Sequence, residues 1–529
     1  MNEAMITTPT SWADWILILP VVLPLMGAAL MLALRAIRGT QAPVAFLVTL
    51  AVLVFDIALF LRVLETGPIA MTMGRWLPPF GISFTADLLG AGLAAISALV
   101  TLVILVVLGA EPRRHAGRDS LYPLVLMLLC GVSGAFLTGD LFNLYVWFEV
   151  MLIASFGLMA ITGTPLVLDG TIKYGFINFL ATSLFLAALG LAYGLLGTLN
   201  MADMAILAGD ANPAAMGVIA ALLLLAFGIK AAAFPVNAWL PASYHTPPAV
   251  ISALMGALLT KVGVYALLRT LITMFPDARA LLDPVIVTAA IATLLLSPLG
   301  AIAETNLRRA IGFLVMGGIG ACLAGLALPS VDGLAGTSFY LGHAMVTMTA
   351  LYLLAGFVEK VTGETDSRAM GGVYGAQSWL SILFFVVMLA AAGVPPFLGF
   401  WPKLMLVEAG FDLSGFFDGA PGYEAVPLLL VGAIILNAWL TLIAGTRLWA
   451  HIFLRPGREG ALSEQPNDRL VRLGRREALI GLGSTGLLVG GIVIAGLLPD
   501  FAIGAARIAA TDLLDPARYL AAVGLGGGQ

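Results

Sequence analysis

Long apolar runs joined by short polar connections constrain the fold of this chain more than any other feature of its sequence. A helix needs roughly 20 apolar residues to cross the hydrocarbon core of a bilayer. Runs of about that length follow one another along nearly the whole chain, which predicts fourteen membrane-spanning helices. The predicted spans are 15–35, 42–62, 83–109, 121–138, 141–162, 173–197, 214–234, 247–270, 281–303, 309–328, 335–358, 378–411, 426–454 and 477–499.

The composition agrees with an all-α integral membrane protein and excludes a water-soluble fold of this size. Sixty per cent of the 529 residues are hydrophobic and only 11% are charged, whereas soluble domains carry roughly 25% charged residues. The net charge is −4 and no basic tail is present, so the sequence gives no indication of a nucleic-acid partner. Cys130 and Cys322 are far apart in apolar runs, which argues against a disulfide framework or a cysteine metal site.

The distribution of basic residues predicts the orientation of the chain in the membrane. With the N-terminus outside and the spans alternating, 17 of the 26 Lys and Arg residues fall in inner loops and six in outer segments. Cytoplasmic loops carry an excess of Lys and Arg. The division therefore favours an even number of spans with both termini on the outer side.

Prolines interrupt two of the predicted spans. Pro235 and a polar stretch, 237–248, follow the apolar run of the seventh span, and Pro395 and Pro396 lie within the twelfth. Proline removes a backbone donor, and carbonyls freed in lipid must be satisfied by protein or water, so we expect both breaks inside the bundle.

The spacing of these breaks suggests an internal repeat. They are five spans apart, so spans four to eight would recur as spans nine to thirteen with inverted topology, an arrangement common in transporters. The alternative is two ordinary proline kinks and no repeat. On the first interpretation, the chain divides into an N-terminal three-helix segment (1–120), a first repeat (121–272), a second repeat (281–455), and an Arg-rich loop with the last helix and tail (456–529).

Glu149 and Lys230 are two ionisable residues of opposite charge that fall well inside predicted spans. An ionised carboxylate at that depth costs several kcal/mol unless it is paired or hydrated. Opposite charges favour the ionised forms and desolvation favours the neutral forms, so the two could make a site whose proton occupancy can be switched. The alternative is a static ion pair that braces two helices, although such pairs stabilise less than apolar packing.

Two further lysines and two histidines extend this set. Lys261 and Lys403 lie too deep to reach either surface without strain, so each is expected to face a hydrated cavity and to exchange its proton. His343 could relay protons between them, or could be a hydrogen-bonded core histidine. His245 lies at the first break, where it could admit protons or cap the loop.

Enzyme motifs are absent or lie in the wrong context. Gly481–Gly486 fits the pattern GxGxxG, but it opens the last span and does not follow a strand. Helix packing explains these glycines better. No P-loop, haem-type pair or cysteine quartet is present, so we expect no catalytic, cofactor or metal site and neither ATP hydrolysis nor electron transfer within this chain.

The proline-containing motifs together resemble the antiporter-like subunits shared by respiratory complex I and Mrp-type multisubunit Na+/H+ antiporters. The resemblance is carried by Phe148-Glu149, by Lys230-Ala-Ala-Ala-Phe-Pro235 and the segment 239–263, and by Gly393-Val-Pro-Pro-Phe-Leu-Gly-Phe-Trp-Pro-Lys403. It covers roughly residues 80–455. The segment Gly74–Asp87 and the chain length are most similar to the D-type subunits of Mrp antiporters.

This resemblance implies a secondary transporter subunit and not an enzyme, and with it a fold, a proton route and partners. The fold would have fourteen helices and two inverted five-helix repeats, in the bacterial inner membrane. Protons would move along Glu149, Lys230, Lys261, His343 and Lys403, and other membrane subunits would complete an antiporter for Na+ or K+. The alternatives are a proton-pumping subunit of complex I or of a membrane-bound hydrogenase, and a scaffold whose charges brace its neighbours and move nothing.

Overall fold

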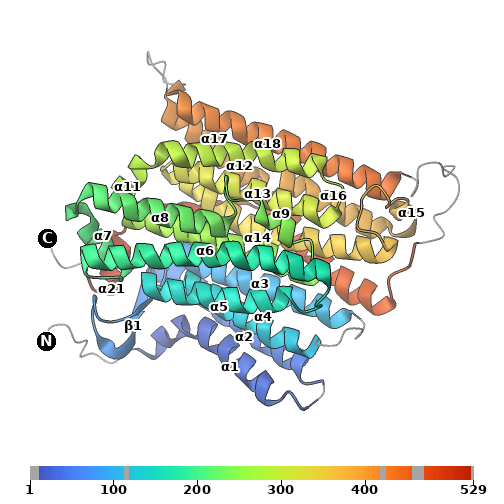
Figure 1. Ribbon diagram of the computed structural model, residues 1–529, viewed down its shortest axis with the longest axis horizontal. Helices are drawn as coiled ribbons and strands as arrows, with labels where there is room; N and C mark the ends of the chain where they lie inside the picture. The colour runs from blue at the N-terminus through green and yellow to red at the C-terminus, as the bar shows by residue number, and fades with distance from the viewer. Residues whose placement is uncertain (1–10, 38, 112–117, 417–423, 456–469, 526–529) are drawn as a thin grey trace.

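The computed structural model describes residues 11–37, 39–111, 118–416, 424–455 and 470–525 as a bundle of near-parallel helices (Figure 1). Eleven helices in these ranges are long and apolar enough to cross a membrane by length and composition. They are α2 (Gln41–Thr66), α3 (Leu88–Ala110), α5 (Leu141–Met159), α6 (Pro165–Leu196), α8 (Pro213–Ala231), α10 and η5 (Ala249–Met274), α12 (Asp283–Ala303), α13 (Leu307–Ala327), α14 (Val331–Thr362), α18 and η7 (Ala425–Leu454), and η8 and α19 (Glu477–Leu497).

Shorter helices complete the bundle. Three of them are apolar: α1 (Leu19–Ala33), α4 (Arg118–Phe136) and α16 (Ser378–Ala392). The others are α7 (Met201–Leu207), α9 (Trp239–Ser243), α11 (Pro276–Leu281), α15 (Val373–Ala376), α17 (Phe400–Ser414), α20 (Asp500–Leu514) and α21 (Ala517–Val523), with 3-10 turns at Trp12–Leu17 (η2), Met73–Arg75 and Ala208–Asp210. An all-α membrane protein is thereby confirmed, whereas fourteen crossings and the inverted repeats stay predictions.

A small hairpin is the one departure from an all-helical chain that the described residues show. Strands β1 (Ile69–Thr72) and β2 (Ser83–Ala86) pair antiparallel, with Ile69 opposite Ala86. The apolar pattern predicts a helix that begins at residue 83. Instead α3 begins at Leu88, because the Asp87 carboxylate accepts a hydrogen bond from Gly90 N at 2.7 Å and so caps the helix.

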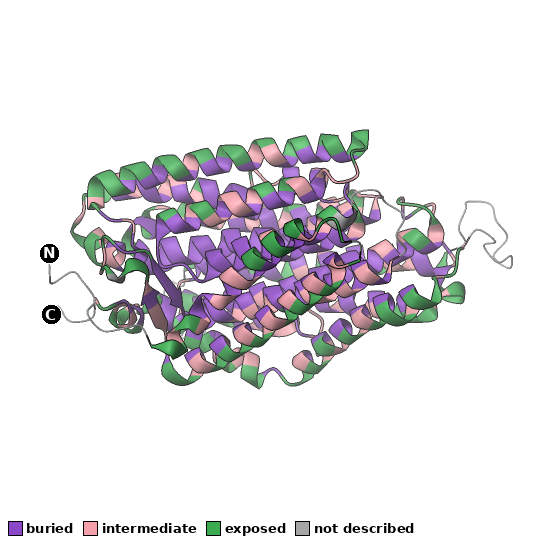
Figure 2. Cartoon of the chain, turned by 90° about the horizontal axis from the view of Figure 1, so that it is seen from below, coloured by how far each residue is buried: buried purple, intermediate pink, exposed green. Residues whose placement is uncertain are grey.

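Burial identifies the centre of the bundle (Figure 2). In the apolar windows of α10, α13 and α14, 100%, 89% and 83% of the residues are buried, against 28% in α2. Large apolar side chains on the periphery, such as Phe176 and Ile153, are about 70% or more exposed, as expected for surfaces that face lipid. Ionisable side chains in the middle of α10 and α14, such as Lys261 and His343, therefore lie at the centre of the bundle.

Both predicted helix breaks are present. Helix α8 ends at Ala231 and the chain turns at Ala232 (φ 62°) before α9, and α16 ends at Ala392 and turns at Gly393 (φ 83°) before α17. Backbone carbonyls freed by a break inside the membrane must accept hydrogen bonds from protein or water. In both breaks a side chain donates such a hydrogen bond. Trp239 Nε1 donates to Ile229 O at 3.0 Å in the first break, and Lys403 Nζ donates to Ala392 O at 2.8 Å in the second.

The C-terminal segment, to which the sequence pattern assigns no role, packs as two helices. Helix α20 lies against α3 and α14, and Arg507 on it pairs with Asp332 at the start of α14 (2.9 Å). Leu513 O accepts a hydrogen bond from Thr273 Oγ1 at 3.2 Å, which ties α20 to the end of η5. Helix α21 lies against β1 at the same end of the bundle (Figure 1).

Candidate proton path

Lys230 lies in the last turn of α8, immediately before the first break, and only 5% of it is exposed. Its ammonium nitrogen is 4.6 Å from the centre of the Phe148 ring and 3.5 Å from Thr182 Oγ1. A cation over an aromatic face is attracted by the ring quadrupole, and both contacts come from neighbouring helices, α5 and α6. The ammonium is thus held between three helices without a carboxylate against it.

Glu149 follows Phe148 on α5 and is only partly buried. Successive residues on a helix point about 100° apart, so when Phe148 faces Lys230, Glu149 is turned away from it. Glu149 interacts electrostatically with Lys230, but the two side chains form no direct ion pair. The ion pair that the sequence favoured is therefore not formed in the structure.

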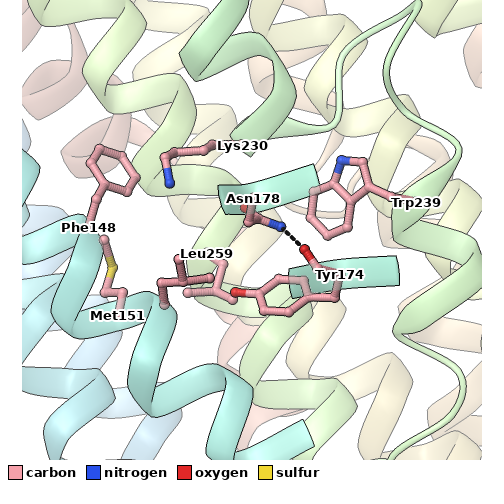
Figure 3. Close-up of a pocket in the computed structure, with 8 residues that line it drawn as sticks. Phe148, Met151, Tyr174, Asn178, Lys230, Trp239 and Leu259 are labelled. Atoms are coloured by element: carbon pink, nitrogen blue, oxygen red, sulfur yellow. Dashed lines mark hydrogen bonds between the residues drawn. The ribbon is translucent and has the colours of Figure 1, made fainter. Parts of the chain in front are cut away.

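A small cavity adjoins Lys230 (Figure 3). Its volume is about 20 Å³, and its lining includes Tyr174, Asn178 and Trp239. A cavity needs roughly 10–15 Å³ to hold one water molecule and must offer it polar partners. The Lys230 ammonium and the Asn178 amide supply such partners, so this cavity can hydrate the ammonium in the membrane interior.

Lys261 is the most deeply buried of the three central lysines, with 1% of it exposed. It lies in the middle of α10 and donates from Nζ to Gly256 O at 2.5 Å. The neighbouring Gly263 meets the end of α8 so closely that an added Cβ would lie 3.1 Å from the carbonyl carbon of Lys230. The two lysine-bearing helices therefore touch at the level of both lysines.

His343 lies on α14 between the central lysine and the second break. The structure places it within electrostatic reach of both Lys403 and Lys261. Its Nδ1 is 3.1 Å from Thr347 Oγ1, while its Nε2 has no hydrogen-bond partner. That free nitrogen points toward the second break, because a Cβ on Gly399 would lie 2.7 Å from it.

Lys403 lies in the first turn of α17, just after the second break, with 6% of it exposed. Its ammonium donates to Ala392 O at 2.8 Å and to Ala391 O at 3.5 Å, the last carbonyls of α16. A cation at a helix C-terminus is favoured by the macrodipole. Lys403 therefore connects the two halves of the interrupted helix.

His245 lies between α9 and α10, at the edge of this set, and is half-buried. Its Nδ1 donates to Pro241 O at 2.8 Å. Burial lowers the pKa of His245, and the hydrogen bond to Pro241 opposes that change. The hydrogen bond is what a loop cap requires, and a role in proton entry stays a prediction.

The lysines of the chain separate into two groups by whether they pair with a carboxylate. Of its five lysines, Lys173 and Lys360 pair with Asp169 and Glu477 at helix ends or surfaces. Among the described residues, Lys230, Lys261 and Lys403 make no ion pair with a carboxylate. Within the same residues, no group of three or more His, Cys, Asp or Glu side chains is placed to hold a metal ion.

Comparison with known proteins identifies the family. Residues 138–418 match the transmembrane family described as NADH:quinone oxidoreductase/Mrp antiporter. The D subunit of a Na(+)/H(+) antiporter from Bacillus subtilis (strain 168) is 34% identical over 517 residues, which cover 96% of this chain and 98% of the relative. The D subunit of a Na(+)/H(+) antiporter from Alkalihalophilus pseudofirmus is 33% identical over 459 residues, which cover 87% and 90%. The chain belongs to the NADH:quinone oxidoreductase/Mrp antiporter family.

Solved structures agree with this family membership. A chain of the Mrp complex from Dietzia sp. DQ12-45-1b aligns with a TM-score of 0.88 and 29% identity over 98% of this chain and all of that one. A chain of the archaeal membrane-bound sulfane sulfur reductase aligns with a TM-score of 0.84 and 26% identity over 96% and 99%. A chain of respiratory complex I from Thermus thermophilus, at 22% identity and a TM-score of 0.79 over 94% and 99%, shows the shared fold alone.

Two buried ion pairs of this family member were not anticipated from its sequence. Arg308 pairs with Glu359 at 2.8 Å and also donates to Pro247 O, which fixes the loop after the first break. At the other end of the bundle, Arg269 pairs with Asp87 at 2.6 Å. All four residues fall near the ends of predicted spans, where charged residues are ordinarily solvated, so span position alone gave no signal.

Replacing Lys403 with Met should lower the thermal stability of the purified protein. The substitution removes the ammonium that satisfies Ala391 O and Ala392 O, and a buried unsatisfied acceptor costs about 1–3 kcal/mol. The measurement is the unfolding midpoint in detergent. Lys173→Met is the control, because its exposed surface pair contributes little; equal midpoints for the two variants would contradict the capping role.

Proposed function

We propose that this chain is the D-type, proton-translocating subunit of a multisubunit Na+/H+ antiporter. The observation that carries the proposal is the presence of three buried ammonium groups that have no carboxylate partner among the described residues, two of them beside helix breaks. Charged residues inside a membrane are costly and mark ion or proton pathways. Its D-type relatives are named as Na+/H+ antiporter components.

The proposed route follows Glu149, Lys230, Lys261, His343 and Lys403. Glu149 is close enough to Lys230 for an electrostatic interaction. The helices that carry Lys230 and Lys261 are in contact at Gly263. His343 in turn lies close enough to Lys261 and Lys403 for electrostatic interactions with both. A lysine can release its proton when the ammonium is desolvated, which a guanidinium does not do. Repulsion between neighbouring cations would then make each proton transfer depend on departure of the one ahead.

The two broken helices support the inverted-repeat interpretation. Each break follows a helix that ends in a left-handed residue, Ala232 or Gly393, and each is followed by a short helix. We propose that residues 121–272 and 281–455 are the two repeats, with 1–120 as an added three-helix segment. Lys230 precedes its break whereas Lys403 follows its own, so the repeats would differ in the position of the cation.

The two curated relatives described above are antiporter components, which supports a membrane transporter subunit in preference to an enzyme. A subunit of a redox-driven complex is the second candidate, supported by the likeness to the sulfane sulfur reductase chain at 26% identity. The D-type antiporter relatives match at higher identity over nearly the whole chain. Other membrane subunits are therefore the expected partners, in a bacterial cell membrane.

Replacing Glu149 with Gln should abolish proton-coupled Na+ transport while leaving the complex assembled. Gln keeps the shape of the side chain but cannot ionise, and a partly exposed residue without an ion pair contributes little to stability. The measurement is Na+-dependent pH change in membrane vesicles. Asp169→Asn, on the exposed face of α6, is the control; normal transport by Glu149→Gln would remove this residue from the route.

The proposed orientation, with both termini outside, can be tested by cysteine labelling. Arg472 precedes η8 and Glu424 directly precedes α18, and both are exposed near opposite ends of the bundle. In a variant without Cys130 and Cys322, a cysteine at Arg472 should react with an impermeant maleimide only from the cytoplasmic side. A cysteine at Glu424 should react only from the outer side, and labelling of both from one side would overturn the orientation.

A further inference from the structure

Helix α2 carries a carboxyl group that the proposed proton path does not use. Asp56 lies near the middle of this helix, is 0% exposed, and neither of its carboxylate oxygens has a hydrogen-bond partner. An ionisable residue in the membrane interior is costly unless something compensates for it. The proton-path residues all lie on α5, α8, α10, α14 and α17, so Asp56 belongs to a separate part of the protein.

Asp56 faces the seam between α2, α3 and α4. One turn before it, Val52 packs against Ala98 of α3 and Leu129 of α4. Helices α2 and α4 both run toward the β-hairpin, since α2 leads into β1, and Leu137 O after α4 accepts from Thr85 N of β2. One turn beyond Leu129 is therefore Ser133, at the level of Asp56, and it too is 0% exposed with an unpartnered hydroxyl.

No cation faces Asp56 from the described parts of the helices around it. Helices α1 and α3 contain no ionisable side chain, and α4 between residues 120 and 136 contributes only Tyr122 and Cys130. On α2 itself, the nearest cation is Arg62, which already pairs with Asp14 of η2 at 2.6 Å. On α20, which reaches α2 through the Phe60–Phe501 ring contact, Arg507 pairs with Asp332.

Other oxygen atoms along the same seam also lack partners. Thr49 on α2 and Thr101 on α3 lie about one turn on the far side of the Val52 layer, and their hydroxyls are buried and unpartnered. Thr49 is seven residues from Asp56, roughly 10 Å along a helix, so the two cannot hold one metal ion together. A carboxyl with a single hydroxyl at its level offers too few ligands for a metal cation, whereas a proton needs only the carboxylate.

We propose that Asp56 is a second proton-binding site of this chain, separate from the path through Glu149 and Lys403. A bound proton removes the charge that would otherwise be buried without compensation, and the Ser133 hydroxyl can then accept from or donate to the neutral acid. An apolar cavity of about 330 Å³ lies between α3 and His343 and is lined by Phe60 and Leu93. Asp56 is not among the residues that line this cavity, so the cavity does not connect Asp56 to the path.

Infrared spectroscopy of the purified complex tests the proposal directly. A neutral carboxylic acid has a carbonyl band distinct from that of a carboxylate, and isotope-labelled aspartate shifts that band away from glutamate bands. We expect a neutral-acid band at neutral pH that disappears in Asp56→Asn and persists in Glu65→Gln, an exposed carboxylate on the same helix. Absence of any band that depends on Asp56 would overturn the proposal.

Two further measurements extend this test. The first distinguishes a bound proton from a bound sodium ion, and the second applies if Asp56→Asn fails to fold. If Na+ at constant pH removes the neutral-acid band, sodium competes with the proton and the assignment of a site for protons alone is wrong. If Asp56→Asn does not assemble, Asp56→Glu should transfer the band from labelled aspartate to labelled glutamate, and a band that stays with aspartate would contradict the assignment.

A transport measurement rests on the proposed function and is interpreted separately from the infrared measurement. Asp56→Asn should reduce proton-coupled Na+ flux or shift its pH dependence, relative to Glu65→Gln. Normal flux with an unchanged pH profile would show that the bound proton takes no part in transport. The infrared result does not depend on the route through Glu149, so failure of that route and failure of the Asp56 site can be told apart.

Discussion

The cost of holding ammonium groups inside a membrane governs the rest of this structure. Lys230, Lys261 and Lys403 are each at most 6% exposed, and within the part of the chain that the structure describes none of them pairs with a carboxylate. Each is instead satisfied by weaker partners: an aromatic ring and a small polar cavity, a carbonyl of its own helix, or the carbonyls of a broken helix. Such partners compensate the charge less fully than a carboxylate would, which fits the proton-carrier role proposed for these lysines.

The helix breaks supply part of that compensation and also depend on it. An interrupted helix exposes carbonyls that lipid cannot satisfy. At the second break Lys403 supplies the missing donors, and at the first break Trp239 does so, which leaves Lys230 free to face the cavity. The two breaks therefore serve the same backbone requirement in different ways, and only one of them uses its lysine for it.

The helical spans and their breaks could be predicted from sequence, because run length and proline positions report directly on membrane helices. The five path residues could be chosen because charge within an apolar run is rare. The direction of each side chain could not be predicted. Phe148 and Glu149 are adjacent on α5, and it is Phe148 and not Glu149 that contacts Lys230. Long-range pairs such as Arg269–Asp87, and the isolation of Asp56, depend on which helices are neighbours, and no local pattern encodes that.

Proton flux in reconstituted vesicles tests the central claim most directly, namely that these buried lysines carry protons. The purified multisubunit complex would be compared as wild type, Lys230→Ala and the surface control Lys173→Ala. The account predicts that Lys230→Ala assembles but loses Na+-coupled proton movement, while Lys173→Ala moves protons at the wild-type rate. Wild-type flux in an assembled Lys230→Ala complex would contradict it, and the buried lysines would then have to be structural.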